Sequence, residues 1–348
     1  MSLTQASNQI LHSLRTMMQS HEVLDADFQT LALEVFNLQY THNTAYQKYC
    51  HSLEICPQSV SHWHDIPRVS TDAFKVTAHP LCTHDTNSAV RTFLTSGTTG
   101  EIRGQHHFTT LDLYELAILK SWQQLDLTAP ATIVLLTPRP EHAPHSSLSH
   151  MMGVLAEHYS SAETIWAIAE DGSMDMEKIN SLAERTSPVA ILGTAIAFLH
   201  LFENTSLTLP SGSYAMETGG YKGTKRQLEK TDLYSLFTEK LGLPHSSVIN
   251  EYSMTELSSQ FYTRGLVGPH RGPVWTRTRV IDPRTGTDAA PGEPGHIAIY
   301  DLANLYSVSA LQTQDIAIAG EGGCFTLLGR DSTALPRGCS RAADHALG

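Results

Sequence analysis

The sequence predicts an α/β fold in which a mostly parallel sheet is flanked by helices and followed by a small β-subdomain. Short apolar runs alternate with segments of helical periodicity through the middle of the chain, which is the pattern of parallel strands joined by helices. After about residue 265, strand-like runs follow one another with turn sequences and no helical segment between them. The chain of 348 residues, 41% hydrophobic and 17% charged, is long enough to bury a sizeable core.

Four regions are expected along the chain. Residues 1–90 are a helical N-terminal region packed on the main domain, and residues 91–264 are an α/β core. Residues 265–330 form the small β-subdomain, and residues 331–348 form a C-terminal tail.

The individual elements follow from hydrophobic spacing. Apolar residues recur at helical intervals between Ile10 and Met18, and again between Phe28 and Leu38 behind the capping candidate Asp25. The strands expected in the core are 131–136, 164–169, 189–192, 213–217 and 247–251, with helices near 147–159, 175–186, 195–204 and 224–241. The strands expected in the β-subdomain are 274–282, 296–300, 315–319 and 324–328.

Charge and composition exclude several classes of protein. A net charge of −12 repels nucleic acid and anionic membrane surfaces, so no nucleic-acid partner is expected. No window reaches the roughly 20 apolar residues that a membrane span needs, and the first residues do not read as a secretory signal. The sequence has five cysteines, an odd number, and no Cys-x-x-Cys motif. Free thiols and a cytoplasmic location are therefore expected.

The segment from Thr95 to Gly100 has the chemistry of a phosphate-binding loop. Its residues, Thr95, Ser96, Gly97, Thr98, Thr99 and Gly100, combine hydroxyl donors with glycines that let the backbone approach a ligand. Arg103 follows with a planar guanidinium suited to phosphate oxygens. The segment matches neither a Walker loop nor a Rossmann fingerprint, and taken alone it could equally be an ordinary polar loop.

Two further segments follow predicted strands, where open α/β sheets bind ligands. Tyr252 could stack on a flat ring, Thr255 could contact a phosphate, and Glu256 could hold Mg²⁺. Gly219 and Gly220 could let backbone lie against a base or sugar. Taken alone, each segment is better explained as a plain strand-to-loop turn than as a binding site.

The 19 histidines include the pairs His62-x-His64 and His106-His107. Their spacing fits no zinc signature, so scattered surface or core histidines are favoured over a metal site.

The order of these segments resembles the adenylate-forming superfamily, which includes acyl-CoA synthetases, adenylation domains and luciferases. The glycine-rich loop, Tyr252-x-x-Thr255-Glu256, Asp315 and Gly329-Arg330 carry the resemblance. The segments 217–223 and 328–340 are more similar still to one branch, the acyl-protein synthetase of bacterial luminescence and its relatives. The likeness covers roughly residues 60–341 and implies the large N-terminal-type domain of that superfamily, with the usual C-terminal domain absent or reduced to a short tail.

The resemblance also implies roles for individual residues. The nucleotide would be ATP with Mg²⁺, bound by the α/β core. Its phosphates would lie on the 95–100 loop, its adenine near Gly219, Gly220 and Tyr252, and its ribose on Asp315. Thr255 and Glu256 would face phosphate and Mg²⁺, and Arg330 would mark the end of the large domain.

Two departures from the superfamily pattern concern positive charge. Arg103 stands where most relatives have lysine, which keeps the charge but changes the geometry. The lysine usually supplied by the C-terminal domain is missing, and Lys222 is the substitute that the sequence offers.

Cys339 is the candidate acyl acceptor. In the acyl-protein synthetases a cysteine near the C-terminus receives the acyl group as a thioester and passes it to a reductase. Cys339 lies nine residues after Arg330, a reach of about 30 Å for extended chain, and Arg337 and Arg341 could raise its thiolate fraction. The alternative is a tail cysteine without a role, while Cys324 falls in a predicted strand and should be packed.

The expected function is activation of a carboxylic acid, expected to be a fatty acid, to an acyl-adenylate, followed by transfer to Cys339 and on to a partner such as a reductase or carrier protein. One alternative is a ligase that gives the acyl group directly to coenzyme A or an amine. Another is a non-catalytic nucleotide-binding scaffold.

Overall fold

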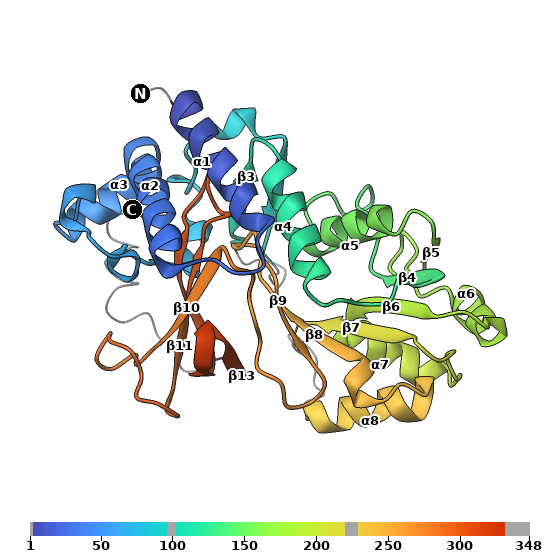
Figure 1. The fold of residues 1–348 in the computed structure, drawn as a ribbon. Coiled ribbons are helices and arrows are strands. Elements are labelled where there is room, and N and C mark those ends of the chain that lie inside the picture. The colour runs from blue at the N-terminus through green and yellow to red at the C-terminus, as the bar shows by residue number, and fades with distance from the viewer. Residues whose placement is uncertain (1–2, 96–101, 220–228, 331–348) are drawn as a thin grey trace. The chain divides into compact units, whose positions relative to one another are not determined.

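The computed structural model describes residues 3–95, 102–219 and 229–330 (Figure 1). The chain divides into two compact units. Unit 1 comprises Met1–Lys120, Met254–Ser259 and Arg271–Gly348, and unit 2 comprises Ser121–Ser253 and Gln260–His270. Both units combine helices with sheets, so the predicted α/β class is confirmed.

Unit 2 is built on a six-stranded sheet with the order β5-β4-β6-β7-β8-β9. Its strands are β4 (Thr132–Leu136), β5 (Glu163–Trp166), β6 (Val189–Thr194), β7 (Tyr214–Thr218), β8 (Val248–Tyr252) and β9 (Phe261–Arg264). All neighbours run parallel except β8 and β9. The carboxyl ends of β7 and β8 therefore lie side by side, at the edge where such sheets bind ligands.

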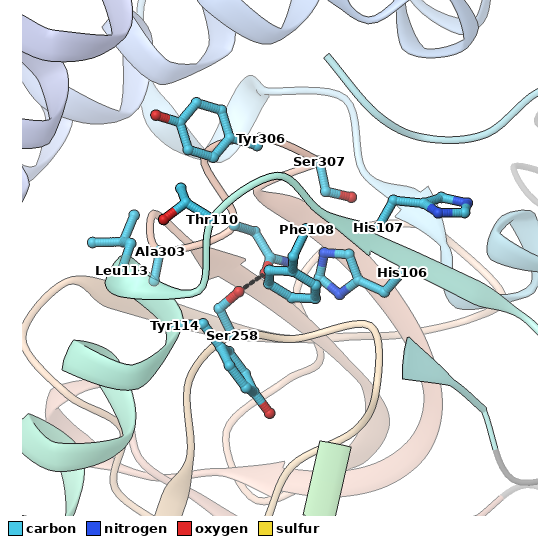
Figure 2. A pocket seen from close by; sticks show the side chains of 11 residues that line it. His106, His107, Phe108, Thr110, Leu113, Tyr114, Ser258, Ala303, Tyr306 and Ser307 are labelled. Atoms are coloured by element: carbon cyan, nitrogen blue, oxygen red, sulfur yellow. Dashed lines mark hydrogen bonds between the residues drawn. The ribbon is translucent and has the colours of Figure 1, made fainter. Parts of the chain in front are cut away.

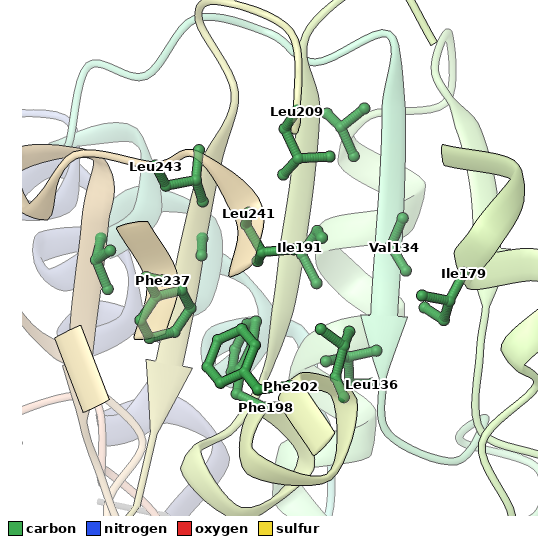
Figure 3. Packing of buried hydrophobic residues seen from close by; sticks show 14 of the residues in the cluster. Val134, Leu136, Ile179, Ile191, Phe198, Phe202, Leu209, Phe237, Leu241 and Leu243 are labelled. Carbon is green, nitrogen blue, oxygen red and sulfur yellow. The ribbon is translucent and has the colours of Figure 1, made fainter. Parts of the chain in front are cut away.

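Helices cover both faces of this sheet (Figure 1). They are α5 (Ser147–His158), α6 (Met176–Asn180), α7 (Ala195–Asn204) and α8 (Lys230–Leu241). Figure 3 shows side chains of α7 and α8, such as Phe198 and Phe237, packed against strand residues such as Ile191. All three are fully buried, and burying one such side chain contributes roughly 1.5–3 kcal/mol.

Unit 1 contains a five-stranded sheet in which β12 is central. The strands are β1 (Val69–Ser70), β10 (Thr276–Ile281), β11 (Pro294–Asp301), β12 (Ala310–Ala319) and β13 (Phe325–Arg330). The order is β1-β12-β11-β10, with β13 also paired to β12, and only β1 runs parallel to its neighbour. A separate antiparallel pair joins β2 (Arg91–Leu94) to β3 (Gln105–Phe108).

The N-terminal helices of unit 1 are α1 (Leu3–Met18), α2 (Asp25–His42) and α3 (Thr44–Ser52), and α4 (Asp112–Gln123) crosses into unit 2. The capping role expected for Asp25 is wrong, because Leu24 is the N-cap and no side chain caps α2. Asp25 is instead the first helical residue, where a carboxylate interacts favourably with the helix dipole, and it pairs with Arg277 at 3.2 Å.

Several element predictions need correction. The helix expected at 175–186 is α6 followed by a 3₁₀ turn at Ser181–Glu184. Strand β12 begins at Ala310 rather than at residue 315. Cys324 lies just before β13 rather than within the strand, and its side chain is buried, as expected. Among the described helices, none is both long and apolar enough to cross a bilayer.

Candidate active site

The stem of the glycine-rich loop is the β2–β3 hairpin in unit 1. The amide of Thr95 donates to the Gly104 carbonyl at 2.9 Å, and the amide of Gly104 donates to Thr95 Oγ1 at 2.8 Å. A Cβ at Gly104 would lie 2.8 Å from Thr95 Cγ2, so glycine is needed for this close approach. The loop residues Ser96, Gly97, Thr98, Thr99 and Gly100 lie outside the described residues.

Arg103 braces this stem. Its Nε donates to the Thr95 carbonyl at 2.6 Å, and one terminal nitrogen donates to the Leu94 carbonyl at 3.2 Å. Its side chain is otherwise exposed. A guanidinium has about five N–H groups, so Arg103 can hold the stem and still present N–H groups and charge to an anion.

Thr255 and Glu256 lie in unit 1, in the segment Met254–Ser259, which belongs to no helix or strand. Buried side chains hold its main chain from outside. His106 Nδ1 lies 2.8 Å from the Thr255 carbonyl, and Asn304 Nδ2 donates to the Glu256 carbonyl at 2.7 Å. The Glu256 side chain itself is half-buried.

Asp301 holds the end of the same segment. Its carboxylate accepts from the amides of Ser258 and Ser259 at 3.0 and 2.9 Å, and from the Ser259 hydroxyl at 2.7 Å. Burial raises the pKa of Asp301 to about 6, although these donors act in the opposite direction. A buried carboxylate with this many donors is a fixed structural acceptor.

His106 is a neutral, buried side chain. Burial lowers its pKa to about 4, and because a carbonyl can only accept, its Nδ1 carries the proton. Figure 2 shows the ring beside Phe108 at the wall of a small pocket. The pocket, about 10 Å³ in volume, has room for roughly one water molecule and is lined on its polar side by His106, His107, Thr110, Ser258, Asn304 and Ser307.

Asp315 and Arg330 are partners in the β12–β13 pairing of unit 1. Asp315 is half-buried, and its amide donates to Thr313 Oγ1 at 3.1 Å. Arg330 is exposed, with one terminal nitrogen 3.5 Å from Gln314 Oε1. The two residues are therefore fixed on neighbouring strands.

In unit 2, Gly219 and Tyr252 lie at the ends of β7 and β8. Gly219 has a φ of +78°, a conformation that favours glycine. The Tyr252 ring is 7% exposed and makes edge contacts with Phe261 and His270, with ring centroids 6.2 and 6.0 Å apart. A site at this strand edge thus has a rigid aromatic wall.

A chain of hydrogen-bonded polar groups ends at His270, whose ring contacts Tyr252. Glu217 Oε1 accepts from Asn250 Nδ2 at 2.6 Å, and Asn250 Oδ1 lies 2.7 Å from His270 Nε2. Burial raises the pKa of Glu217 to about 7, with Lys230 opposing the shift. Burial lowers the pKa of His270 to about 3, so a neutral imidazole donates Nε2–H to the amide oxygen.

Comparison with known proteins decides the family. The family model described as "Acyl-protein synthetase, LuxE" matches residues 2–348. The chain belongs to this family. A long-chain-fatty-acid–luciferin-component ligase of Vibrio harveyi is 22% identical over an alignment 336 residues long, which covers 89% of this chain and 85% of the relative. Membership in the LuxE family confirms that the protein is an adenylate-forming ligase.

Solved structures confirm the fold of this LuxE-family protein. ATP-bound MatB from Rhodopseudomonas palustris is 19% identical with a TM-score of 0.51, over 71% of this chain and 49% of MatB. An open form of 2-hydroxyisobutyryl-CoA ligase, in complex with 2-HIB-AMP and CoA, is 15% identical with a TM-score of 0.66, over 88% of this chain and 71% of that ligase. The match thus spans about half the length of MatB.

The residues predicted for the site are distributed over both units. Unit 1 brings Thr95 together with Arg103, and joins Thr255 to β3 through His106. Unit 2 places Gly219 and Tyr252 on neighbouring strand ends. Gly220, Lys222 and Cys339 lie outside the described residues, and the described parts contain no group of three His, Cys, Asp or Glu side chains that could hold a metal ion.

Sequence reasoning missed His106, Asn304, Asp301 and Glu217. His106 was visible only as half of a histidine pair and was assigned no role. Glu217 and Asn250 fall within the predicted strands 213–217 and 247–251. A polar residue in a buried strand is the signal that could have identified them.

Proposed function

We propose that this LuxE-family protein uses ATP and Mg²⁺ to activate a fatty acid as an acyl-adenylate, and then transfers the acyl group to a thiol. The observation that carries the proposal is the family match over residues 2–348. It is supported by the placement in one unit of the loop stem at Thr95–Gly104 and the fixed Thr255–Glu256 segment. The long-chain acid named in the V. harveyi relative suggests the substrate class.

In the first step, a carboxylate oxygen of the acid attacks the α-phosphorus of ATP and pyrophosphate leaves. Catalysis then depends on positioning and on spreading negative charge. The hydroxyl and amide groups of residues 95–100 are proposed to bind phosphate oxygens, with Thr255 as a further donor. Arg103 would add positive charge from the stem that it braces.

Glu256 is the residue proposed to hold Mg²⁺. Its half-buried carboxylate stands on a main chain that Asn304 fixes, and Mg²⁺ prefers one or two carboxylates combined with phosphate oxygens. When bound, the ion supplies charge neutralisation on the phosphates.

The nucleoside would be bound by other residues. Tyr252 offers a buried aromatic wall and Gly219 an open backbone at the strand ends, which suits a flat base. Asp315, fixed in β12, is proposed to accept hydrogen bonds from the ribose hydroxyls. Lys222 is proposed as the cation that replaces the missing lysine.

In the second step, the Cys339 thiolate attacks the acyl carbon of the adenylate. A C–S bond forms, the bond from the acyl carbon to the phosphate oxygen breaks, AMP leaves, and the thiol proton goes to solvent. The thioester is then available to an acceptor protein such as a reductase or carrier protein. The name of the V. harveyi relative, a ligase of fatty acid to a luciferin component, supports an acceptor of this kind.

Pyrophosphate exchange tests the first step. The protein is incubated with ATP, Mg²⁺, labelled pyrophosphate and a panel of fatty and aromatic acids of different lengths. Label should enter ATP only with an accepted acid and should be strongest with long-chain fatty acids. Absence of acid-dependent exchange across the whole panel would count against adenylation and favour a nucleotide-binding scaffold.

Intact-protein mass spectrometry tests the second step. After reaction with ATP and an accepted acid, the chain should gain the mass of one acyl group, and hydroxylamine should remove it. The Cys339→Ser variant should still catalyse exchange but should not form the hydroxylamine-sensitive adduct. Cys56→Ser, which removes a partly exposed free thiol, is the matched control. An unchanged adduct in Cys339→Ser would reject this cysteine in favour of another acylated residue, whereas pyrophosphate exchange without any adduct in the wild type would favour direct transfer to coenzyme A or an amine.

A further inference from the structure

The segment Met254–Ser259 carries Thr255 and Glu256 but has little structure of its own. It forms no helix or strand, and within it the Leu257 amide donates to the Met254 carbonyl at 3.0 Å. A catalytic segment of this kind keeps its geometry only if neighbouring groups fix it.

Three side chains bind the segment at consecutive points along its main chain. His106 binds the Thr255 carbonyl, Asn304 binds the Glu256 carbonyl, and Asp301 binds the amides of Ser258 and Ser259. The exposed fractions of His106, Asn304 and Asp301 are 2%, 2% and 0%. Water therefore cannot easily replace these bonds, and losing one would leave a main-chain group without its partner.

The His106 bond connects the segment to the loop stem. His106 lies in β3, two residues after Gly104, whose amide and carbonyl close the stem with Thr95. Its ring packs against Phe74 and Phe108, with centroids 5.4 and 4.2 Å away. The ring is thus held in one orientation, and one strand fixes both the loop stem and the Thr255 carbonyl.

Asn304 is itself held from a distant part of the chain. The buried Gln39 of α2 donates from Nε2 to the Asn304 carbonyl at 2.9 Å and to the Leu305 carbonyl at 3.2 Å. The Ser258 hydroxyl also lies 2.6 Å from Asn304 Oδ1, a bond drawn in Figure 2. The N-terminal helix α2 therefore supports the residue that fixes Glu256.

We infer that His106 is a positioning residue, which sets Thr255 and Glu256 against the loop stem, and that Asn304 supports it by fixing the Glu256 main chain. Neither residue needs to touch the substrates. This inference rests on the proposed function, because it assigns the positioned residues to phosphate and Mg²⁺. A misplacement of about 1 Å can cost on the order of 100-fold in rate.

Two substitutions at His106 separate the effect of its hydrogen bond to the Thr255 carbonyl from the effect of its ring size. His106→Phe keeps a ring but removes the donor, whereas His106→Asn places an amide N–H close to the original Nδ1. In acid-dependent pyrophosphate exchange, His106→Phe should lower kcat by about 10- to 100-fold and change the KM for ATP by less than about threefold. His106→Asn should recover most of the loss.

His107→Phe is the matched control. His107 is the next residue of β3 and is also buried, with 9% exposed against 2% for His106, but its ring bonds to Thr92 Oγ1 at 2.9 Å. Equal losses of kcat in His106→Phe and His107→Phe, or no recovery with His106→Asn, would overturn the inference. Ser258→Ala, a milder variant that removes the hydroxyl beside Asn304, should lower kcat by a few-fold while the protein stays folded.

Hydrogen exchange provides a readout that does not require activity. In the full chain, His106→Phe should increase amide exchange in Met254–Ser259, and His107→Phe should leave this segment as in the wild type. An unchanged segment in His106→Phe would overturn the inference even if the wild type shows no pyrophosphate exchange. If the wild type shows no acid-dependent pyrophosphate exchange, that result alone would count against the proposed function and not against this inference.

Discussion

Individual buried groups in this protein have charge states set by their surroundings. His106 is neutral because burial and the nearby His107 lower its pKa, although its hydrogen bond to the Thr255 carbonyl acts in the opposite direction. The unfolded chain binds a proton at this imidazole near pH 6.5, but the folded chain binds it only near pH 4. Folding and protonation at this residue are therefore linked.

The sign of this linkage gives a prediction for stability. Because the folded-state pKa is lowered, the contribution of His106 is complete above pH 6.5 and is lost as the pH falls towards 4. Between pH 7.5 and 5 the loss is about 2 kcal/mol. Urea unfolding should show that His106→Asn loses less stability than the wild type over this interval, by about that amount.

His12→Asn is the control for this experiment, because His12 is an exposed histidine of α1. It should follow the wild-type pH dependence. Identical pH dependence of His106→Asn and the wild type would contradict a buried neutral imidazole at His106.

At the scale of elements, the β2–β3 hairpin depends on one close approach. A Cβ at Gly104 would lie 2.8 Å from Thr95 Cγ2 and 3.3 Å from Phe74 Cβ. Gly104→Ala should therefore destabilise the protein by about 1–3 kcal/mol through overpacking, measured by urea unfolding.

A second substitution identifies the cause. Thr95→Ser removes Cγ2 but keeps the hydroxyl that accepts from the Gly104 amide. Gly104→Ala on the Thr95→Ser background should lose clearly less stability than Gly104→Ala alone. Additive losses would show that contact with Cγ2 is not the cause.

Glu217, near the end of β7, should affect the pH dependence of stability in the opposite direction to His106. Burial raises the pKa of Glu217 to about 7, so its contribution to stability is present below pH 4.5 and is lost as the pH rises through 7. Glu217→Gln keeps an acceptor for Asn250 without this dependence. From pH 5 to pH 8, urea unfolding should show the variant gaining stability relative to the wild type by about 2.5 kcal/mol.

Glu163→Gln supplies a comparison for this variant. Glu163 is a half-exposed carboxylate of β5 in the same sheet, paired with Arg185. A relative gain of the same size in Glu163→Gln would show that the effect does not come from burial of Glu217.

The elements also show which parts of the fold can be predicted from sequence. Helix α7 begins and ends at the expected residues, and β4 and β6 fall within one or two residues of the expected runs, because fully buried strands and amphipathic helices have strong apolar patterns. The β2–β3 hairpin and β9 were not predicted. Gln105-His106-His107 has no apolar alternation, and its pairing depends on contacts that local spacing does not encode.

The candidate site also has parts that a local sequence pattern indicates and parts that it does not. Thr255 and Glu256 could be proposed from the sequence alone because they form a short local motif. Their supports could not, because Asn304 is 48 residues from Glu256 and Gln39 is 265 residues from Asn304. Hydrogen bonds between such distant residues are properties of the folded topology, and a single sequence contains no spacing rule for them.

At the scale of the whole molecule, the chain passes from unit 2 to unit 1 between Ser253 and Met254. Tyr252 and Glu256, four residues apart, thus belong to different units. Tyr252 is proposed to bind the base and Glu256 to hold Mg²⁺, and these proposed roles can be tested in the intact chain.

The increase in Tm on ligand binding can test the proposed role of Glu256 in holding Mg²⁺. A ligand present at about 100 times its Kd adds about 2.7 kcal/mol to the stability of the state that binds it, so ATP with Mg²⁺ should raise the Tm of the wild type. Glu256→Gln should retain only the increase that ATP gives in EDTA, because its amide is a poor ligand for Mg²⁺. Glu293→Gln, which neutralises an exposed carboxylate, should behave as the wild type. If Glu256→Gln kept the full Mg²⁺-dependent increase, the ion would have to be held by other residues.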